Sequence, residues 1–337
     1  MIEKKAHKIL IIGPSWVGDM VMAQSLFMTL KANDRTCQID VLAPEWSFPL
    51  LERMPEVTKA HPMPLIHGQF GFSKRVQLGK HLRKEHYQQV IVLPNSWKSA
   101  LIPYFANIPL RTGYIGEVRW GLLNDARKLD KTALSMTVQR FVALALANNE
   151  SPAFDYPVPK LQIDKKNQQI VIDKFQLNRA ANILALCPGA EYGPAKQWPA
   201  EHFAELARHK LAQGWAVWIF GSEKDREIAG QINQLTDNAC QDFCGETTLG
   251  EAVDLMSLAE VVVSNDSGLM HVAAALDKQL IALYGSSDPA FTPPLNDAAK
   301  VMNLNLECSP CFKRECPLGH THCLTEMSAK QVIAEIN

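Results

Sequence analysis

The segment from Val261 to Leu276 constrains the fold of this chain more than any other. It reads VVVSNDSGLMHVAAAL. Three β-branched residues, a short polar turn and an apolar, alanine-rich stretch predict a strand, a turn and a helix in that order. The turn leaves the first N–H groups of the helix without partners, and such a terminus carries partial positive charge. The segment therefore predicts either a βα unit capped by Asp266 or Ser267, or a turn that binds a phosphate.

The same succession of strand, polar turn and helix recurs along the chain. Further strands are predicted over Lys8–Ile12, Gln38–Ala43, Gln89–Leu93, Asn182–Cys187, Ala216–Phe220 and Gln279–Tyr284. Helices are predicted over residues 19–31, 73–85, 132–147, 199–213 and 224–235. Strands that alternate with helices through short turns are typical of parallel, doubly wound sheets.

A Pro-rich polar stretch, Ser151–Lys160, interrupts this alternation and is interpreted as a linker. A chain of 337 residues is long enough for two domains. We therefore predict an α/β protein of two Rossmann-like domains, residues 1–160 and 161–325, that face a cleft. A helix at about residues 326–337 is expected to pack back on the first domain.

Composition and charge narrow the class of protein. An apolar content of 47% and a charged content of 20% are typical of a soluble globular protein. The apolar stretch Ile9–Ile12 is too short for a signal peptide or a membrane span, so we expect a cytoplasmic protein that is at most peripheral to a membrane. A net charge of −1 argues against a nucleic-acid partner.

The charge is nevertheless uneven. Between His61 and Arg140 there are 12 Lys and Arg against four Asp and Glu, a local charge of +8. This segment predicts either an anionic partner, such as a phosphorylated lipid headgroup or an acidic sugar, or an ordinary solvated face.

Several polar turns that follow predicted strands carry groups capable of chemistry. The first turn, Gly13–Asp19, lacks the residues of a P-loop and of a G-x-G-x-x-G dinucleotide turn, which argues against an ATPase and a nicotinamide enzyme. Asp19 is either a helix N-cap or a carboxylate that accepts a proton from a substrate hydroxyl.

In the second half, Lys196 lies just before a predicted helix. It is either a cation that binds a diphosphate at the start of that helix or a solvated surface lysine. Glu223 either accepts hydrogen bonds from ribose hydroxyls or favours the start of the next helix. With the turn at Asp266 and with His271 one helical turn beyond it, these residues fit a nucleoside diphosphate bound by the second domain and opposed by a base from the first.

The sequence resembles a known family on these motifs. PSWVGDMVMAQSL, PGAEYGPAKQWP, FGSEKD and NDSGLMHVAAAL, together with LPNSWKSALIP, RTGYIGEVRWGLLND and FTPP, are similar to the lipopolysaccharide heptosyltransferases of glycosyltransferase family 9. The resemblance implies a GT-B fold and inverting transfer of L-glycero-D-manno-heptose from ADP-heptose. The implied acceptor is the first heptose of the inner core on Kdo2-lipid A, at the cytoplasmic side of the inner membrane.

The resemblance also assigns roles to individual residues. It implies that Asp19 is the general base and that Lys196 contacts the diphosphate. The implied donor-binding residues are Gly189, Lys196, Glu223, Asp266, Ser267, Gly268 and His271. The implied acceptor-side residues are Gly18, Asn95, Lys98 and Arg119. Because Lys196 and a helix N-terminus can stabilise the departing ADP, we expect no catalytic metal and no required cofactor.

Four of the eight cysteines lie close together in the sequence, as Cys308-x2-Cys311-x4-Cys316-x6-Cys323, with His320 and His322 in the last interval. Thiolates on short loops can hold a structural zinc ion, although this spacing is not a common zinc pattern. Reduced loop cysteines and disulfides formed on isolation are the alternatives.

Two other functions fit the predicted fold. A nucleotide-sugar 2-epimerase would keep the sugar on its nucleotide, and a binding protein for nucleotide sugars would have no catalytic base. The presence of both Asp19 and Lys196 argues against the binding protein, and detection of a heptose transferred to a lipid acceptor separates the transferase from the epimerase. The acceptor hydroxyl, the selectivity between heptose epimers, the oligomeric state and domain closure do not follow from the sequence.

Overall fold

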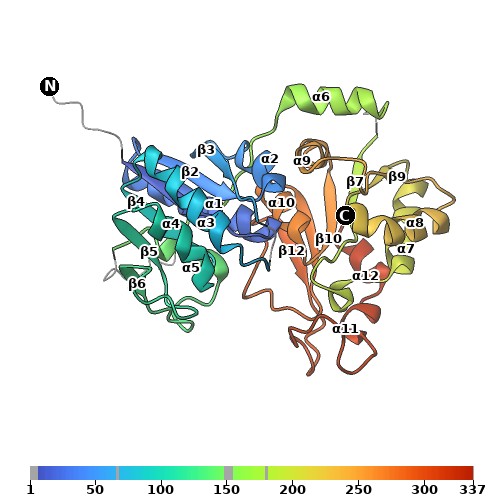
Figure 1. Cartoon of the computed structure of the whole chain (residues 1–337). Coiled ribbons are helices and arrows are strands. Elements are labelled where there is room, and N and C mark those ends of the chain that lie inside the picture. Colours follow the sequence, from blue (N-terminus) through green and yellow to red (C-terminus); the bar gives the residue numbers. More distant parts are fainter. Residues whose placement is uncertain (1–6, 66–67, 148–154, 179–180, 337) are drawn as a thin grey trace. The chain divides into compact units, whose positions relative to one another are not determined.

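The computed structural model describes residues 7–65, 68–147, 155–178 and 181–336. The chain divides into two compact units, Met1–Pro159 and Lys160–Asn337. In Figure 1 the first unit runs from blue to green and the second from light green to red. The unit boundary lies at the end of the predicted linker, whose residues 151–154 are outside the described residues.

The described part of each unit contains one six-stranded parallel sheet. The strands of the first are β1 (Lys8–Ile12), β2 (Gln38–Ala43), β3 (Val57–Pro62), β4 (Gln89–Val92), β5 (Leu110–Tyr114) and β6 (Asp125–Arg127). The strands of the second are β7 (Ile183–Cys187), β8 (Ala216–Ile219), β9 (Gln241–Asp242), β10 (Val261–Asn265), β11 (Gln279–Leu283) and β12 (Ala299–Met302). The two doubly wound parallel sheets predicted from the sequence are confirmed.

Helical elements connect most successive strands and also follow the last strand of the second unit (Figure 1). In the first unit they are α1 (Val17–Asn33), η1 (Glu45–Ser47), α2 (Phe48–Leu51), α3 (Phe72–Leu82), η2 (Arg83–Glu85), η3 (Trp97–Ala100), α4 (Leu101–Phe105) and α5 (Thr137–Ala143). In the second they are α6 (Lys165–Lys174), η4 (Pro194–Lys196), α7 (Ala200–Ala212), η5 (Glu223–Asp225), α8 (Arg226–Leu235), α9 (Leu249–Met256), α10 (Gly268–Ala275), α11 (His322–Thr325) and α12 (Ala329–Ala334). Among the described residues, none of the helices combines the length and hydropathy needed to span a bilayer.

Both sheets have the same strand order. It is β3-β2-β1-β4-β5-β6 in the first unit and β12-β11-β10-β7-β8-β9 in the second. The direction in which the chain adds strands therefore reverses between β1 and β4, and between β7 and β10. Ligands of such sheets bind outside the carboxyl ends of the strands at this reversal, because the loops on either side diverge there.

Complete burial of the central strands explains their apolar composition. All five residues of β7 and of β10 are buried, as are the last four residues of β1. A strand covered on both faces needs apolar side chains at successive positions, which is the pattern that predicted these strands. One face of the second sheet packs on α7, α8 and α12 through a cluster that includes Trp198, Phe203 and Ile232.

Several predicted boundaries differ from the structure. The helix predicted over residues 132–147 is the shorter α5, since the Asp130 carboxylate accepts the N–H groups of Thr132 and Ala133 and holds them in a turn. The helix predicted from Lys224 begins at Arg226, because Ser222 and Asp225 form a capping box around η5.

The prediction that the C-terminal helix packs back on the first domain is corrected. Helix α12 lies beside α7 in the second unit (Figure 1). Val332 and Ile336 join the core of that unit, and the Trp198 indole N–H donates to the Met327 carbonyl at 2.7 Å. Burial of these apolar side chains where they adjoin α7 stabilises the local arrangement.

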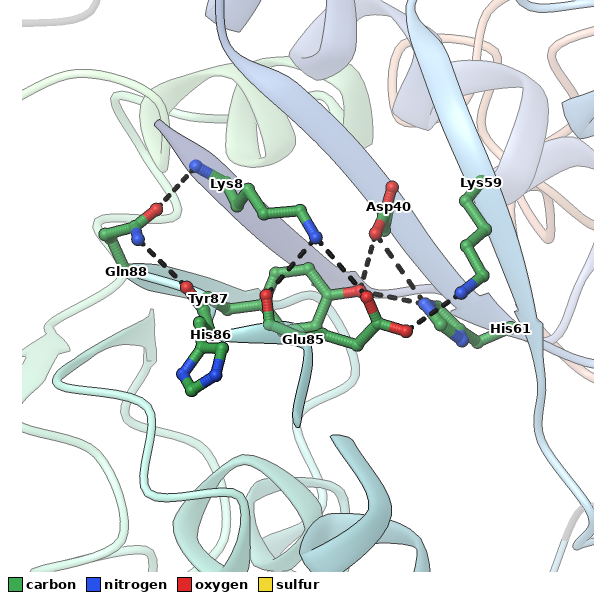
Figure 2. Close-up of polar contacts among 8 residues, drawn as sticks. All are labelled: Lys8, Asp40, Lys59, His61, Glu85, His86, Tyr87 and Gln88. Atoms are coloured by element: carbon green, nitrogen blue, oxygen red, sulfur yellow. Dashed lines mark hydrogen bonds and ion pairs between the residues drawn. The ribbon is translucent and has the colours of Figure 1, made fainter. Parts of the chain in front are cut away.

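A buried polar network joins β2 and β3 to Tyr87, which lies just before β4 (Figure 2). Tyr87 donates its hydroxyl to Asp40 of β2 at 2.6 Å, and the Nε2 atom of His61 in β3 lies 2.8 Å from the same hydroxyl oxygen. Because the Tyr87 hydroxyl donates its proton to the Asp40 carboxylate, the His61 ring acts as the donor to the tyrosine oxygen. Burial and the Asp40 carboxylate raise the pKa of Tyr87 far above its ordinary value, so it remains a neutral donor.

Candidate functional site

The second sheet gathers a cluster of polar side chains at the reversal between β7 and β10. Lys196, in η4 after β7, donates its ammonium to the carboxylate of Asp266, which directly follows β10. Ser287, beyond the end of β11, donates its hydroxyl to the same carboxylate oxygen. The side chains of Lys196 and Asp266 are only 17% and 5% exposed. The structure thus joins two predicted site residues that are far apart in sequence.

The loop that carries Lys196 is held by the cysteine-containing segment. The Ala195 N–H donates to the Arg314 carbonyl at 3.0 Å, and the Tyr192 hydroxyl donates to the Phe312 carbonyl at 2.9 Å. The Lys196 ammonium and the Arg314 guanidinium each lie 5.2 Å from the centre of the Tyr192 ring. A cation near an aromatic ring is attracted by the negative face of the ring. These contacts fix the position of the lysine.

Gly193 permits this close approach. A Cβ atom at residue 193 would lie 2.5 Å from the Arg314 carbonyl oxygen, and φ is +155°. Any side chain at this position would push the Lys196 loop away from Arg314.

The amino terminus of α10 has no side-chain cap. Ser267 occupies the N-cap position with an extended backbone, and its side chain makes no capping hydrogen bond. The Asp266 carboxylate is directed to Lys196 and Ser287 instead. The prediction that Asp266 or Ser267 caps the helix with its side chain is therefore corrected. The first N–H groups of α10, from Gly268 onward, are left for another acceptor, and an anion is the acceptor that the helix dipole favours.

His271 lies in the first turns of α10 and is buried. Burial lowers its pKa to about 4, Asp266 opposes this shift, and Lys196 adds to it. The imidazole is therefore neutral near pH 7 and brings no additional positive charge to the site.

Glu223 lies at the carboxyl end of β8, the strand next to β7. Its side chain is 73% exposed, and it accepts from Arg226 Nε at 2.7 Å. It does not cap α8, whose N-cap is Asp225. An exposed carboxylate at this edge of the sheet can accept hydrogen bonds from the hydroxyls of a bound sugar.

Gly189 packs closely against a neighbouring side chain. A Cβ atom at this residue would lie 2.6 Å from a carboxylate oxygen of Asp225. The glycine therefore makes room for Asp225, which sequence reasoning did not select. The buried Asn265 was also missed: it accepts from the Trp198 N–H at 3.1 Å and donates to the Pro188 carbonyl at 2.7 Å.

Asn265 thereby ties both ends of the Lys196 loop to β10. Asn265 could have been recognised in the sequence as a polar residue at the end of an apolar strand, and Ser287 by the Gly-Ser-Ser turn after β11. Neither sequence feature identifies the hydrogen-bond partners of these side chains.

In the first unit, Asp19 lies in the first turn of α1. The N-cap of α1 is Trp16, which makes no side-chain capping bond, so the alternative that Asp19 is the N-cap is corrected. The helix begins two residues earlier than predicted and places Asp19 at its third position. Asp19 is half-buried and Gly18 is buried, at the carboxyl end of β1 where the strand order reverses. A carboxylate in this turn is stabilised by the helix dipole.

Three of the four predicted acceptor-side residues, Asn95, Lys98 and Arg119, follow β4 or β5, whereas Gly18 lies in α1 after β1. Arg119 is buried and donates to the Pro94 carbonyl at 2.7 Å, to the Tyr114 carbonyl and to the Asn95 side chain at 3.4 Å. Burial lowers its pKa below the ordinary value for arginine. Arg119 therefore holds the Asn95 loop in position. Lys98 is half-buried in η3, and its carbonyl accepts from Arg75 at 3.2 Å.

The basic segment between His61 and Arg140 separates into two groups. Arg75 and Arg119 are buried, and Arg111, Arg127 and Arg140 donate to backbone carbonyls. The exposed members are Lys74, Lys80, Arg83, Lys84, Lys128 and Lys131. The whole segment is therefore not a solvated or ligand-facing basic surface as the sequence suggested, because several of its arginines bond to backbone carbonyls and stabilise loops. The exposed charge concentrates on α3 and η2.

The four clustered cysteines line a cavity of about 20 Å³ together with His320 and Ser286. All eight cysteines are free thiols, and the structure thus shows no disulfide in this segment. Among the described residues, no three His, Cys, Asp or Glu side chains are grouped so that they could hold a metal ion. The structural zinc stays a prediction. Backbone N–H groups, first that of Thr321, lower the pKa of the Cys316 thiol.

Comparison with known proteins agrees with this arrangement. The chain is 48% identical to lipopolysaccharide heptosyltransferase 2 of Salmonella typhimurium and 46% identical to that of Escherichia coli, in each case over 98% of this chain and 97% of the relative. The solved structure of E. coli ADP-heptose LPS heptosyltransferase II matches with a TM-score of 0.88 at 43% identity, over 98% of this chain and 97% of that one.

The model of one protein family matches residues 75–322, which include the Lys196 loop, Asp266 and His271. This match covers most of the chain, and the sequence resemblance and the pair of Rossmann-like units of a GT-B protein are both confirmed. The chain belongs to glycosyltransferase family 9, the heptosyltransferases.

Proposed function

We propose that this protein is an inverting heptosyltransferase that transfers L-glycero-D-manno-heptose from ADP-heptose to the first heptose of the lipopolysaccharide inner core. The observation that carries the proposal is the pairing of Lys196 with Asp266 beside the uncapped start of α10. Together they offer an ammonium group and backbone N–H donors at the strand-order reversal of one sheet. This combination suits the diphosphate of a nucleotide sugar.

Inversion at the anomeric carbon needs one in-line displacement. The acceptor oxygen forms a bond to the anomeric carbon while the bond from that carbon to the phosphate oxygen breaks. In the proposed mechanism Asp19 accepts the proton of the acceptor hydroxyl, and ADP departs with the electron pair of the broken bond. Lys196 and the N–H groups of α10 stabilise the negative charge that develops on the departing ADP.

The remaining site residues bind and orient the donor and the acceptor. Glu223 accepts from the ribose hydroxyls, and the neutral His271 contacts the donor without adding charge. Gly18, Asn95 and Lys98 contribute to the acceptor side, where Arg119 positions the Asn95 loop. Positive charge at the diphosphate comes from the protein, so the reaction needs no cofactor, and excess EDTA is expected to leave the rate unchanged.

The acceptor is anionic and anchored to lipid A. We place the reaction at the cytoplasmic face of the inner membrane, with the protein bound peripherally and without a nucleic-acid partner. The exposed lysines of α3 supply positive charge that suits the phosphates and acidic sugars of this acceptor.

The test is incubation of the protein with ADP-heptose and core-truncated heptosyl-Kdo2-lipid A, followed by mass analysis. The expected result is an acceptor heavier by one heptose and an equal amount of ADP. Conversion of the donor to an epimer without transfer would indicate an epimerase. Donor binding without any turnover would indicate a binding protein, and either result would overturn the proposal.

A further inference from the structure

Three loops of the first unit present apolar side chains to solvent. Phe70 and Phe72 follow β3, Trp97 follows β4, and Val118 and Trp120 follow β5. Tyr104 of α4 completes the set. Their exposed fractions are 46% for Phe70, 48% for Phe72, 39% for Trp97, 80% for Val118, 70% for Trp120 and 44% for Tyr104. We call these six residues the aromatic edge.

Contacts join the members of the aromatic edge into one surface. The Phe70 ring lies 5.9 Å from that of Phe72 and 5.1 Å from that of Trp97. Phe105 bridges Phe72 and Tyr104, with ring centres 5.9 Å and 5.4 Å away.

The loop with Val118 and Trp120 is attached to the same surface. The Trp97 N–H donates to the Glu117 carboxylate at 3.0 Å, and the Glu117 N–H donates to the Asn95 carbonyl at 3.2 Å. Soluble proteins rarely expose apolar side chains in a contiguous group unless something binds there.

Basic side chains adjoin this surface. Lys74, Lys80, Arg83 and Lys84 are exposed on α3 and η2, the elements that continue from Phe72. Arg83 donates to the Phe105 carbonyl at 2.7 Å, and the Arg111 guanidinium lies 5.8 Å from the Tyr104 ring centre. Glu117 is the acidic side chain bonded within the edge. The aromatic edge therefore combines amphipathic rings with an excess of positive charge.

We propose that the aromatic edge docks on an anionic lipid bilayer, with its rings in the interfacial region and the lysines of α3 against the headgroups. Tryptophan, tyrosine and phenylalanine side chains favour the membrane interface, and lysines next to them are attracted to anionic lipids. A second protein chain would not require the flanking lysines.

The docking surface has a consequence for the reaction. Its loops follow β3, β4 and β5, so they lie at the carboxyl edge of the sheet, as Asp19 does after β1. Docking here presents a membrane-anchored acceptor to this edge of the unit. This consequence rests on the proposed function, whereas lipid binding itself does not.

Sedimentation with vesicles tests the docking. The wild-type protein is expected to bind vesicles of phosphatidylcholine with about 30% phosphatidylglycerol, and to bind pure phosphatidylcholine at least about tenfold more weakly. A triple variant, Phe72→Ser with Val118→Ser and Trp120→Ser, should lower the affinity for the anionic vesicles by about tenfold or more. Lys74→Glu with Lys80→Glu and Lys84→Glu should do the same and should remove the salt dependence.

A matched control uses the exposed helix α6 of the second unit. Ile170 is 55% exposed and Lys166 is exposed, so Ile170→Ser with Lys166→Glu makes similar changes away from the aromatic edge. This variant should bind vesicles as the wild type does. Circular dichroism and ADP affinity should be unchanged in all variants.

The outcomes separate the docking from the proposed function. The triple variant at Phe72, Val118 and Trp120 should lose transfer to acceptor embedded in vesicles and keep transfer to the deacylated, water-soluble acceptor. If both variants bind anionic vesicles as the wild type does, the docking inference is wrong, even if transfer occurs. A change from dimer to monomer with unchanged vesicle binding would assign the edge to self-association and also overturn the inference. Vesicle binding without transfer to either acceptor would contradict the proposed function alone.

Discussion

The ammonium of Lys196 and the carboxylate of Asp266 form an ion pair at the carboxyl ends of β7 and β10. The pair leaves the lysine positively charged and fixed beside the start of α10, while Ser287 donates to the same carboxylate oxygen. Loss of one partner of an ion pair that is largely removed from water strongly destabilises the folded protein, because the other charge is then buried without a counter-charge. A diphosphate that binds here therefore encounters a lysine whose position is already determined.

Lys196→Met should lower kcat/KM for ADP-heptose by about 10²-fold to 10³-fold and should also weaken ADP binding, because the lysine stabilises the diphosphate. Isothermal titration with ADP and steady-state kinetics measure the two effects. Lys224→Met is the matched control, since Lys224 is exposed and pairs with Glu191 at the surface. Unchanged ADP affinity in Lys196→Met would contradict the assignment.

Asp19→Asn should lower kcat by about 10²-fold to 10⁴-fold, because the amide cannot accept the proton of the acceptor hydroxyl. ADP affinity should remain within about twofold of the wild-type value, because the donor-binding residues are all in the other unit. Asp34→Asn, at the opposite end of α1, is the control for loss of a carboxylate near this helix. Equal losses of transfer and of ADP binding in Asp19→Asn would refute its role as the base.

The buried His271 should make the second unit sensitive to acid. Its folded-state pKa is about 4, below the ordinary value of 6.5, so the unfolded chain binds a proton in this interval and the folded chain does not. The contribution of His271 to stability is complete above pH 6.5 and is lost as the pH falls toward 4, by about 3 kcal/mol in total.

His271→Gln should remove this part of the pH dependence. The measurement is the free energy of unfolding from hydrogen exchange of the buried amides of β10 and β11 at several pH values between 4 and 7. His209→Gln is the control, because His209 is exposed on α7. An equally steep loss of stability in His271→Gln and wild type would show that another group is responsible.

Cys316 should be the most reactive thiol of the chain. Backbone N–H donors lower its pKa, whereas burial raises the pKa of Cys187 and Cys244. The thiolate is the nucleophile, so iodoacetamide at about pH 7.5 should label Cys316 first and leave the two buried thiols unlabelled. Peptide mass spectrometry identifies the labelled residues.

The same experiment tests the structural zinc. A zinc ion held by Cys308, Cys311, Cys316 and Cys323 would protect all four thiols until a chelator is added. Metal analysis of protein purified without chelator provides the independent measurement. Rapid labelling of Cys316 in untreated, metal-free protein would contradict the zinc prediction.

Tyr87→Phe should destabilise the first unit by about 2 kcal/mol, because it removes the donor to the buried Asp40 carboxylate. The other carboxylate oxygen of Asp40 has no hydrogen-bond partner among the described residues, so the charge becomes less well satisfied. Tyr114→Phe is the matched control. It removes a hydroxyl bonded to the neutral Arg140 carbonyl and should cost about 1 kcal/mol. Urea unfolding with equal m-values gives the comparison, and a smaller effect for Tyr87→Phe would contradict the importance of the network.

The sequence by itself determined the two parallel sheets, their central strands and the turns that carry Asp19, Lys196, Glu223 and Asp266. Fully buried strands need continuous apolar runs, and the polar turns after them are visible in the sequence because Gly, Pro, Ser and Asp interrupt those runs. The end of a strand is a local property, and local patterns therefore locate it.

Only the tertiary structure decided which side chains meet. It paired Lys196 with Asp266, assigned Gly189 to the packing of Asp225, and buried Arg75 and Arg119 in a segment whose charge had suggested a surface. It also placed α12 against α7. These outcomes depend on strand order and on contacts between residues far apart in the chain. Residue type and spacing carry little information about such contacts, since an exposed lysine and a paired lysine have the same sequence signature.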